Sequence, residues 1–158
     1  MKTSRPKEKD IFARRPVIEL RASLNRLDLA AEADVAGLES FMEATIAAAM
    51  MIAYADGEAD ANERRRIISM FRASPLLGRF SAEDIAREID AHSQAFERDH
   101  PSATASARAQ IVVTDLTSEQ FGALLNVCAS VLEADGVRHP AEEQALEQIA
   151  LLRPWGRR

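Results

Sequence analysis

The stretch LESFMEATIAAAMMIAYADGEADANERRRI, residues 38–67, decides the fold of this chain. Its first part, residues 38–55, is apolar at nearly every position, which is typical of a helix with neighbours on all sides in the centre of a bundle. An Asp-Gly pair follows at 56–57, and glycine is the residue that most readily adopts the left-handed conformation after a helix C-terminus. We therefore expect a central helix over 38–55, a glycine turn and a second helix that begins after residue 60.

A shortened copy of this turn, EADGVRHPAEEQAL, occupies residues 133–146. Asp56 and Glu63 of the first copy correspond to Asp135 and Glu142 of the second, and each acidic position recurs 79 residues further along the chain. Self-similarity of this kind indicates a repeated structural unit. The sequence therefore predicts an all-α fold, a pseudo-symmetric antiparallel helical bundle of about seven helices built from two helix–Asp-Gly turn–helix units.

Length and composition agree with a single helical domain. The chain has 158 residues, of which 47% are hydrophobic, 28% charged and only 5% aromatic. Such a composition is ordinary for a soluble globular protein, and the scarcity of aromatic and β-branched runs favours helices over sheets. We expect a flexible basic leader over 1–16, one helical domain over 17–152 and a tail over 153–158.

The remaining helices are indicated by capping signals and apolar spacing. A first helix is expected near 17–27, followed by a polar break over 31–37. Residues 97–116 are expected to form an irregular link into a short helix, because a proline and a polar start precede the β-branched run QIVV. Three helix starts show a capping residue with a polar partner three positions later: Asp60 with Glu63, Ser81 with Asp84, and Thr117 with Gln120. Inward positions are expected at Ile67, Ile68, Met70, Phe71, Ile85, Ile89, Phe96 and Cys128.

Charge is distributed unevenly along the chain. Residues 1–26 carry eight Lys or Arg against three Asp or Glu, whereas residues 27–158 carry 12 against 22. An acidic body does not suit nucleic acid, whose binding requires clustered cations, but it does suit metal cations. The run ERRRI at 63–67 is interpreted as a solvated basic face paired with Glu58 and Glu63.

The acidic positions of the two turns have a structural and a chemical interpretation. Structurally, Asp60 caps a helix, and Glu63 and Glu142 lie in first turns, where the helix dipole favours an anion. Asp56 and Asp135 fit this interpretation less well, because they follow helix C-termini, where carbonyl oxygens already carry partial negative charge. A cation would relieve that charge, and carboxylate and carbonyl oxygens are the ligands of Ca²⁺, Mg²⁺ or Mn²⁺. The candidate metal ligands are Asp56, Glu63, Asp135, Glu142 and, more weakly, Asp60.

Other chemistry has less support in the sequence. The turns are not EF-hands, because Gly57 directly follows the first aspartate instead of taking the sixth loop position. His92 and His100 lack zinc-ligand spacing and a cysteine partner. No nucleophile elbow or glycine-rich phosphate loop is present, so an enzyme is not expected.

The two turns and their surroundings carry a family resemblance. YADGEADANERRRIISMFRASPLLGRFSAEDI and LEADGVRHPAEEQALEQIALL resemble the TerB-like tellurite-resistance family over about residues 40–152. The resemblance implies an all-α bundle without catalytic activity, with acidic turns associated with divalent cations and with tellurite and stress resistance. It further implies a protein partner and peripheral contact with the inner membrane. Val137 and His139 depart from the family's more polar or acidic second turn, which weakens that half of the site.

Two functions follow as expectations. In the first, the chain is a cytoplasmic, non-enzymatic module that binds a divalent cation (Ca²⁺, Mg²⁺ or Mn²⁺) within a stress-resistance complex. In the second, it is a metal-free helical adaptor, whose turns serve only as caps and whose acidic face or basic leader docks a protein. The sequence does not fix the oligomeric state.

Overall fold

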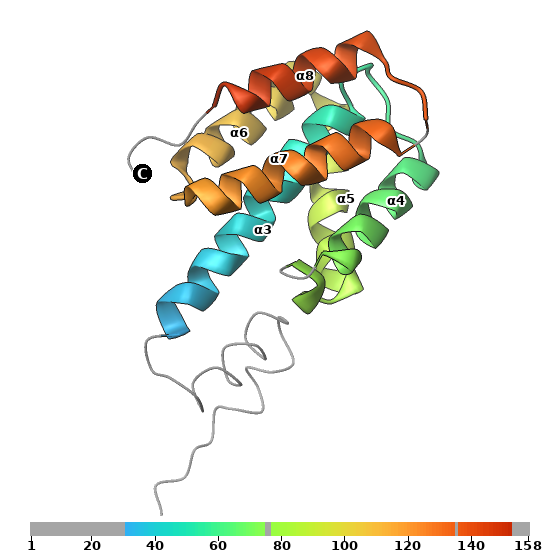
Figure 1. Cartoon of the computed structure of the whole chain (residues 1–158). Helices are drawn as coiled ribbons and strands as arrows, with labels where there is room; N and C mark the ends of the chain where they lie inside the picture. Colours follow the sequence, from blue (N-terminus) through green and yellow to red (C-terminus); the bar gives the residue numbers. More distant parts are fainter. Residues whose placement is uncertain (1–30, 75–76, 135, 153–158) are drawn as a thin grey trace, which may run out of the picture.

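The chain is all-α wherever its structure is described. A computed structural model describes residues 31–74, 77–134 and 136–152, with side chains described from residue 37 onward. Within these ranges it contains six α-helices, one 3-10 turn and no strand (Figure 1). The helices are α3 (Ala31–Ala53), α4 (Ala61–Ala73), α5 (Ala82–Arg98), α6 (His100–Val113), α7 (Ser118–Glu133) and α8 (Pro140–Ala150), and the 3-10 turn is η1 (Leu77–Arg79).

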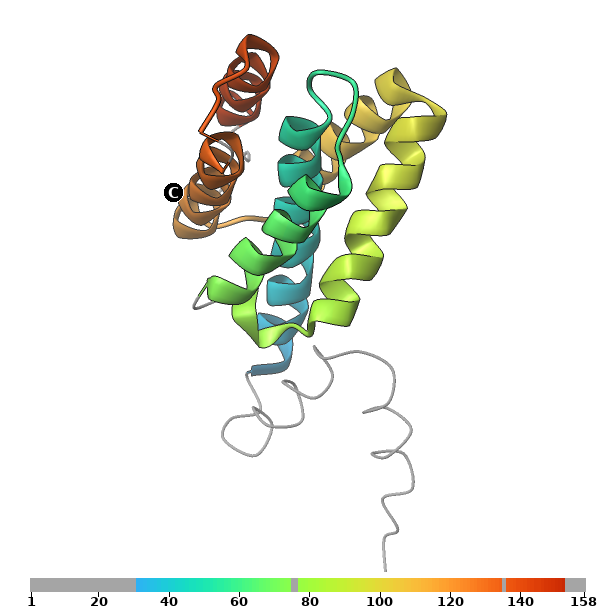
Figure 2. The ribbon, with the colours of Figure 1, turned by 90° about the vertical axis from the view of Figure 1, so that its right-hand side faces the viewer.

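Helix α3 is the centre of the fold. It packs against each of the other five described helices, and Figure 2 shows α7 and α8 on one side of it with α5 on the other. Every residue from 44 to 54 is buried. Most are alanine, isoleucine and methionine, and the alanines let neighbouring helices approach closely. Thr45 is accommodated because its hydroxyl donates to the Phe41 carbonyl at 2.7 Å. The predicted central helix is therefore confirmed.

The helices around α3 bury the faces that the sequence indicates. Ile67, Phe71, Ile85, Ile89, Phe96 and Cys128 are buried, whereas Ile68 and Met70 are only partly buried against the same core. The predicted caps also form. Asp60, Ser81 and Thr117 each accept a hydrogen bond from the backbone N–H three residues later. These bonds satisfy amides that the helix itself leaves without a partner.

Two sequence predictions about helix limits are wrong. The polar break expected over 31–37 is absent, because α3 runs through it from Ala31, and its alanines and glutamate are good helix formers. The irregular link expected over 97–116 does not form. Most of these residues belong to α6, and a single residue, Asp99, separates α5 from α6. Pro101 lies in the first turn of α6, where its missing N–H removes no helical hydrogen bond.

Some predictions fall outside the described residues. These are the leader over 1–16, the helix near 17–27 and the tail over 153–158. The count of about seven helices and the pseudo-symmetry of the bundle therefore stay predictions. None of the helices that the structure describes combines the length and apolar character that a membrane span requires.

Candidate functional site

The two Asp-Gly turns share one pattern of backbone hydrogen bonds. In the first turn the Gly57 N–H donates to the Tyr54 carbonyl at 2.9 Å, and in the second the Gly136 N–H donates to the Glu133 carbonyl at 3.1 Å. Both glycines have positive φ, +110° and +74° respectively. A side chain at such a φ would be strained, so glycine is required for the chain to reverse at these points. Each turn thereby leads directly into the helix that follows, α4 or α8.

Residues at the junction of α5 and α6 contact the first turn and hold it in position. His100 places its Nε2 2.7 Å from the Tyr54 carbonyl, the same oxygen that accepts the Gly57 N–H. The Tyr54 ring stacks on Phe96 at a centroid separation of 4.9 Å, and its hydroxyl donates to Glu97 at 3.3 Å. These contacts hold the end of α3 and the beginning of the turn in one position. Spacing in the sequence does not reveal them, because they join residues more than 40 positions apart.

Three of the predicted metal ligands form local hydrogen bonds at the first turn. Asp56 is exposed, and its Oδ1 accepts the Glu58 N–H at 3.3 Å. Asp60 and Glu63 form a reciprocal capping box, with distances of 2.8 Å from the Glu63 N to Asp60 Oδ1 and 2.7 Å from the Asp60 N to Glu63 Oε2. The Glu63 N–H holds the pKa of the Asp60 carboxyl below its usual value. The capping role expected of Asp60 is therefore confirmed.

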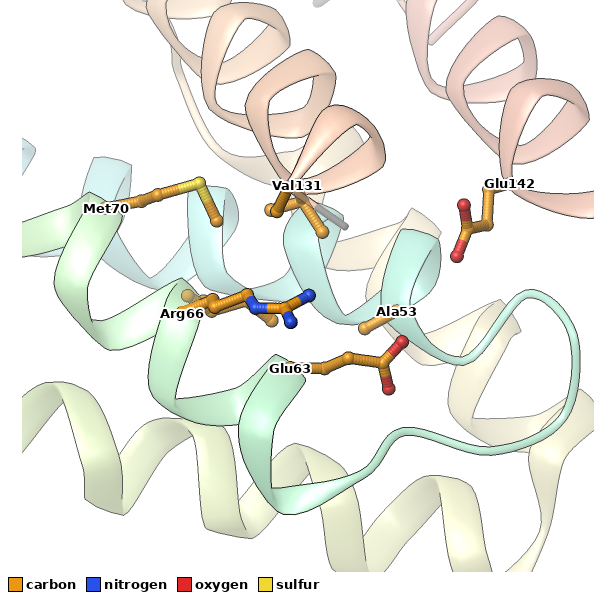
Figure 3. Close-up of a pocket in the computed structure, with 8 residues that line it drawn as sticks. Ala53, Glu63, Arg66, Met70, Val131 and Glu142 are labelled. Atoms are coloured by element: carbon orange, nitrogen blue, oxygen red, sulfur yellow. The ribbon is translucent and has the colours of Figure 1, made fainter. Parts of the chain in front are cut away.

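Glu63 and the fourth described candidate, Glu142, line one small cavity (Figure 3). Each lies in a first turn, Glu63 in α4 and Glu142 in α8. Glu142 is buried, with 8% of its surface exposed, and Glu63 is partly buried. The cavity has a volume of about 20 Å³, which is room for one water-sized occupant. Its remaining walls are mainly apolar and come from α3, α4 and α7, including Ala53, Ile67 and Val131.

A cationic side chain, Arg66, also lines this cavity. Figure 3 shows its guanidinium extending beside Glu63 toward Ala53. The run ERRRI predicts a solvated basic face paired with Glu58 and Glu63, and for Arg64 this prediction is wrong. Arg64 turns instead to Glu97, at 4.0 Å, and donates to the Ala59 carbonyl at 3.2 Å. The signal for Arg66 was its position three residues after Glu63, a spacing that puts both side chains on one helix face.

The cavity thus combines two carboxylates from two helices with one guanidinium. Asp56 and Asp60 do not belong to its lining, and Asp135 lies outside the described residues. Among the residues that are described, no group of three or more His, Cys, Asp or Glu side chains is gathered as a metal site. The described carboxylates can supply oxygen ligands from α4 and α8 together, with further ligands needed from water or from neighbouring groups.

The histidines and the cysteine stand apart from this site. His92 is partly buried, and its burial lowers the pKa of its imidazole. Cys128 is fully buried in α7, which raises the pKa of its thiol to about 12. A thiol with that pKa is neutral at physiological pH and is neither a nucleophile nor a metal ligand there.

The chain was compared with known families, curated proteins and solved structures. Residues 42–152 match the family model described as Tellurite resistance protein TerB. The matched segment includes both Asp-Gly turns, Glu63 and Glu142, and it extends from within α3 to the end of the described residues. The comparisons with curated proteins and with solved structures gave no match.

Proposed function

Because this chain belongs to the TerB tellurite-resistance family, we propose that it is a non-enzymatic helical module that binds a divalent cation and acts through a protein complex. The observation that carries the proposal is the meeting of Glu63 and Glu142 at one cavity, although they lie in first turns of helices 79 residues apart in the chain. We place the module in the cytoplasm, in peripheral contact with the inner membrane through its partners.

The chemistry of the cavity favours a hard cation. Two carboxylates supply up to four oxygens, and the apolar walls exclude most of the water that would screen their charge. Carboxylate oxygens select Ca²⁺, Mg²⁺ or Mn²⁺ over softer metals. Water would complete the ligand set. Asp56, which the structure places outside the cavity lining, would bind the ion only if its turn moved toward the cavity, and Asp135 stays a predicted ligand. A bound ion would then connect α4 to α8.

Titration of the full chain with Ca²⁺ and with Mn²⁺, followed by calorimetry and thermal unfolding, tests this function. Glu142→Gln and Glu63→Gln each remove one charged ligand, and glutamine at residue 63 retains an oxygen for the capping box. We expect each variant to bind the ion about tenfold more weakly or worse. For the unmodified chain, an ion at 100 times its Kd would add about 2.7 kcal/mol to the free energy of unfolding.

Glu147→Gln is the matched control, since this glutamate is exposed on α8 and lies outside the cavity lining. It removes the same charge from the same helix and should leave ion binding unchanged. Equal weakening by Glu147→Gln and Glu142→Gln would mean that general acidity, not the cavity, attracts the ion. If millimolar ion produces no heat of binding and no change in melting temperature, the proposed cation-binding function is wrong.

A second function, a metal-free adaptor, has one observation in its favour. Asp56, Asp60 and Glu63 all accept backbone N–H groups at the first turn, so each of these carboxylates already has a protein partner there. In that case Asp56→Asn combined with Asp135→Asn should leave stability independent of added ions, as in the unmodified chain. Under the cation-binding function the same pair of changes should abolish an ion-dependent rise in melting temperature and, by removing repulsion, stabilise the ion-free protein.

A further inference from the structure

A second, wider hollow lies beside the cavity and has the opposite charge. This open groove has a volume of about 610 Å³ and runs between α4 and the C-terminal part of α7. Its lining includes Asn62, Arg65, Arg66 and Ser69 from α4, with Ser130 and Ala134 opposite them. No carboxylate belongs to this lining. The groove is therefore a cationic hollow on a body that carries ten more acidic than basic residues over 27–158.

The arginines of the groove are available to a ligand. Arg65 and Arg66 are exposed, and no described carboxylate lies within 4.0 Å of either guanidinium. Arg64 on the same helix is different, because it is engaged by Glu97 and the Ala59 carbonyl. Guanidinium groups bind carboxylates through paired, charge-assisted hydrogen bonds. Asn62 and Ser69 add neutral polar groups at the same wall.

We propose that the groove between α4 and α7 docks a carboxylate-rich segment of a partner protein, and that a cation in the neighbouring cavity strengthens this docking through Arg66. The volume suits a short stretch of peptide. The acidic surroundings repel extended polyanions, such as an anionic membrane surface or the backbone of a nucleic acid, more strongly than a short peptide. An acidic protein segment is the anion that best fits two adjacent arginines in such a hollow.

Arg66 provides the connection, because it lines both the acidic cavity and the groove. Its guanidinium lies on the Glu63 side of the cavity in Figure 3, although no described carboxylate is within 4.0 Å of it. A divalent cation at Glu63 and Glu142 would place a like charge next to it and disfavour that position. The side chain would then turn to the groove and join Arg65. This part of the inference rests on the proposed cation site, and by linkage the acidic segment must strengthen cation binding by the same factor.

Fluorescence anisotropy of the full chain with a fluorescein-labelled hexaglutamate peptide tests the groove, with hexaglutamine as the neutral probe. The double variant Arg65→Gln/Arg66→Gln should bind hexaglutamate at least about tenfold more weakly. The control Arg72→Gln/Arg108→Gln removes the same charge from exposed positions outside the groove and should retain nearly full binding. Equal weakening in both variants, or equal binding of the neutral probe, overturns the docking groove. Binding to phosphatidylglycerol vesicles but not to hexaglutamate overturns it in favour of a membrane.

The same measurement with and without saturating Mn²⁺ tests the coupling. The unmodified chain should bind hexaglutamate more tightly with the ion, and Arg66→Gln should bind it equally in both conditions. Arg66→Gln should also bind Mn²⁺ more tightly, since the competing guanidinium is gone. If calorimetry shows Mn²⁺ bound while peptide affinity stays constant, the coupling is wrong and the cation site stands. If no Mn²⁺ binds, both the cation site and the coupling are wrong. The arginine variants still test whether the groove binds hexaglutamate.

Discussion

Single residues in this bundle are governed mainly by how deeply they are buried, and Cys128 is the clearest case. Its side chain is fully buried in α7 and its thiol pKa is raised to about 12. Only the thiolate reacts readily with alkylating reagents. We therefore expect no labelling by iodoacetamide in the native protein at pH 8 and complete labelling in denaturing urea. Rapid labelling of the native protein would contradict the packing of α7 against α3.

His92 should make the stability of the protein depend on pH between the native pKa of the imidazole and its ordinary value of 6.5. Burial lowers that pKa in the folded state, so over this interval the unfolded chain binds more protons than the folded one. The free energy of unfolding should fall as pH decreases through the interval and recover above pH 6.5. Urea denaturation at a series of pH values measures this slope. His92→Gln should reduce it, and an unchanged slope in the variant would assign it to other groups.

Capping residues could be predicted from sequence, whereas Arg66 could not. Asp60, Ser81 and Thr117 act on amides only three positions away, so the sequence contains both partners at a fixed spacing. The position of Arg66 depends on the space that α3, α7 and α8 leave beside α4. Nothing local in ERRRI separates Arg64, which turns to α5, from Arg66, which lines the cavity.

At the scale of the element, two glycines in similar helical surroundings should respond oppositely to the same substitution. A Cβ at Gly78 in η1 would collide with the backbone carbonyl oxygen of Arg72, whereas a Cβ at Gly122 in α7 would meet no atom within 4 Å. Gly78→Ala should lower the free energy of unfolding by about 1–3 kcal/mol through overpacking. Gly122→Ala should raise it by about 0.5–1 kcal/mol, because alanine loses less backbone entropy in a helix.

Thermal unfolding of the two glycine variants checks this prediction. For a chain of this size, 1 kcal/mol corresponds to about 2–4 °C in melting temperature. Because glycine is replaced by alanine in both variants, a difference in stability between them must come from their positions and not from the type of substitution. A loss of stability in Gly122→Ala would contradict the open space around Gly122, and an unchanged stability in Gly78→Ala would contradict the close approach of η1 to the end of α4.

The corner between α5 and α6 shows why some element limits escaped prediction. Asp99 closes one helix through its N–H, which donates to the Ala95 carbonyl at 3.0 Å, and opens the next through its carboxylate, which accepts the Ser102 N–H at 3.1 Å. A proline and a polar run normally indicate a loop. Here one residue caps both helices, so the polar run is the first turn of α6. His100 is the next residue, and its Nε2 lies 2.7 Å from the Tyr54 carbonyl oxygen. A longer link between the helices would not hold His100 in this position.

At the scale of the whole molecule, the repeat predicted the partners of the site but not how closely they meet. The spacing of 79 residues paired Glu63 with Glu142, and the bundle brings both to one cavity. Asp56 was expected to share that site, yet the structure leaves it exposed beside the Glu58 N–H. Sequence similarity between the turns fixes corresponding positions, whereas the rotation of each helix about its axis decides which carboxylates face inward.

A cation at this cavity should change the dynamics of two distant parts of the chain together. Glu63 lies in the first turn of α4 and Glu142 in the first turn of α8, so an ion held by both carboxylates would restrain these two turns. Amide hydrogen exchange reports such local opening. We expect slower exchange in the first turns of α4 and α8 with saturating Mn²⁺.

Helix α6 supplies the internal reference for this experiment, because it packs on α3 and α5 and contributes nothing to the cavity. Its exchange should change little beyond the global stabilisation that any ligand of the native state confers. Glu142→Gln should remove the added protection from α4 as well as from α8, since the ion would lose its bridge. Protection that persists in α4 of this variant would place the ion at the first turn alone, and the cavity would then not be a shared site of the two repeats.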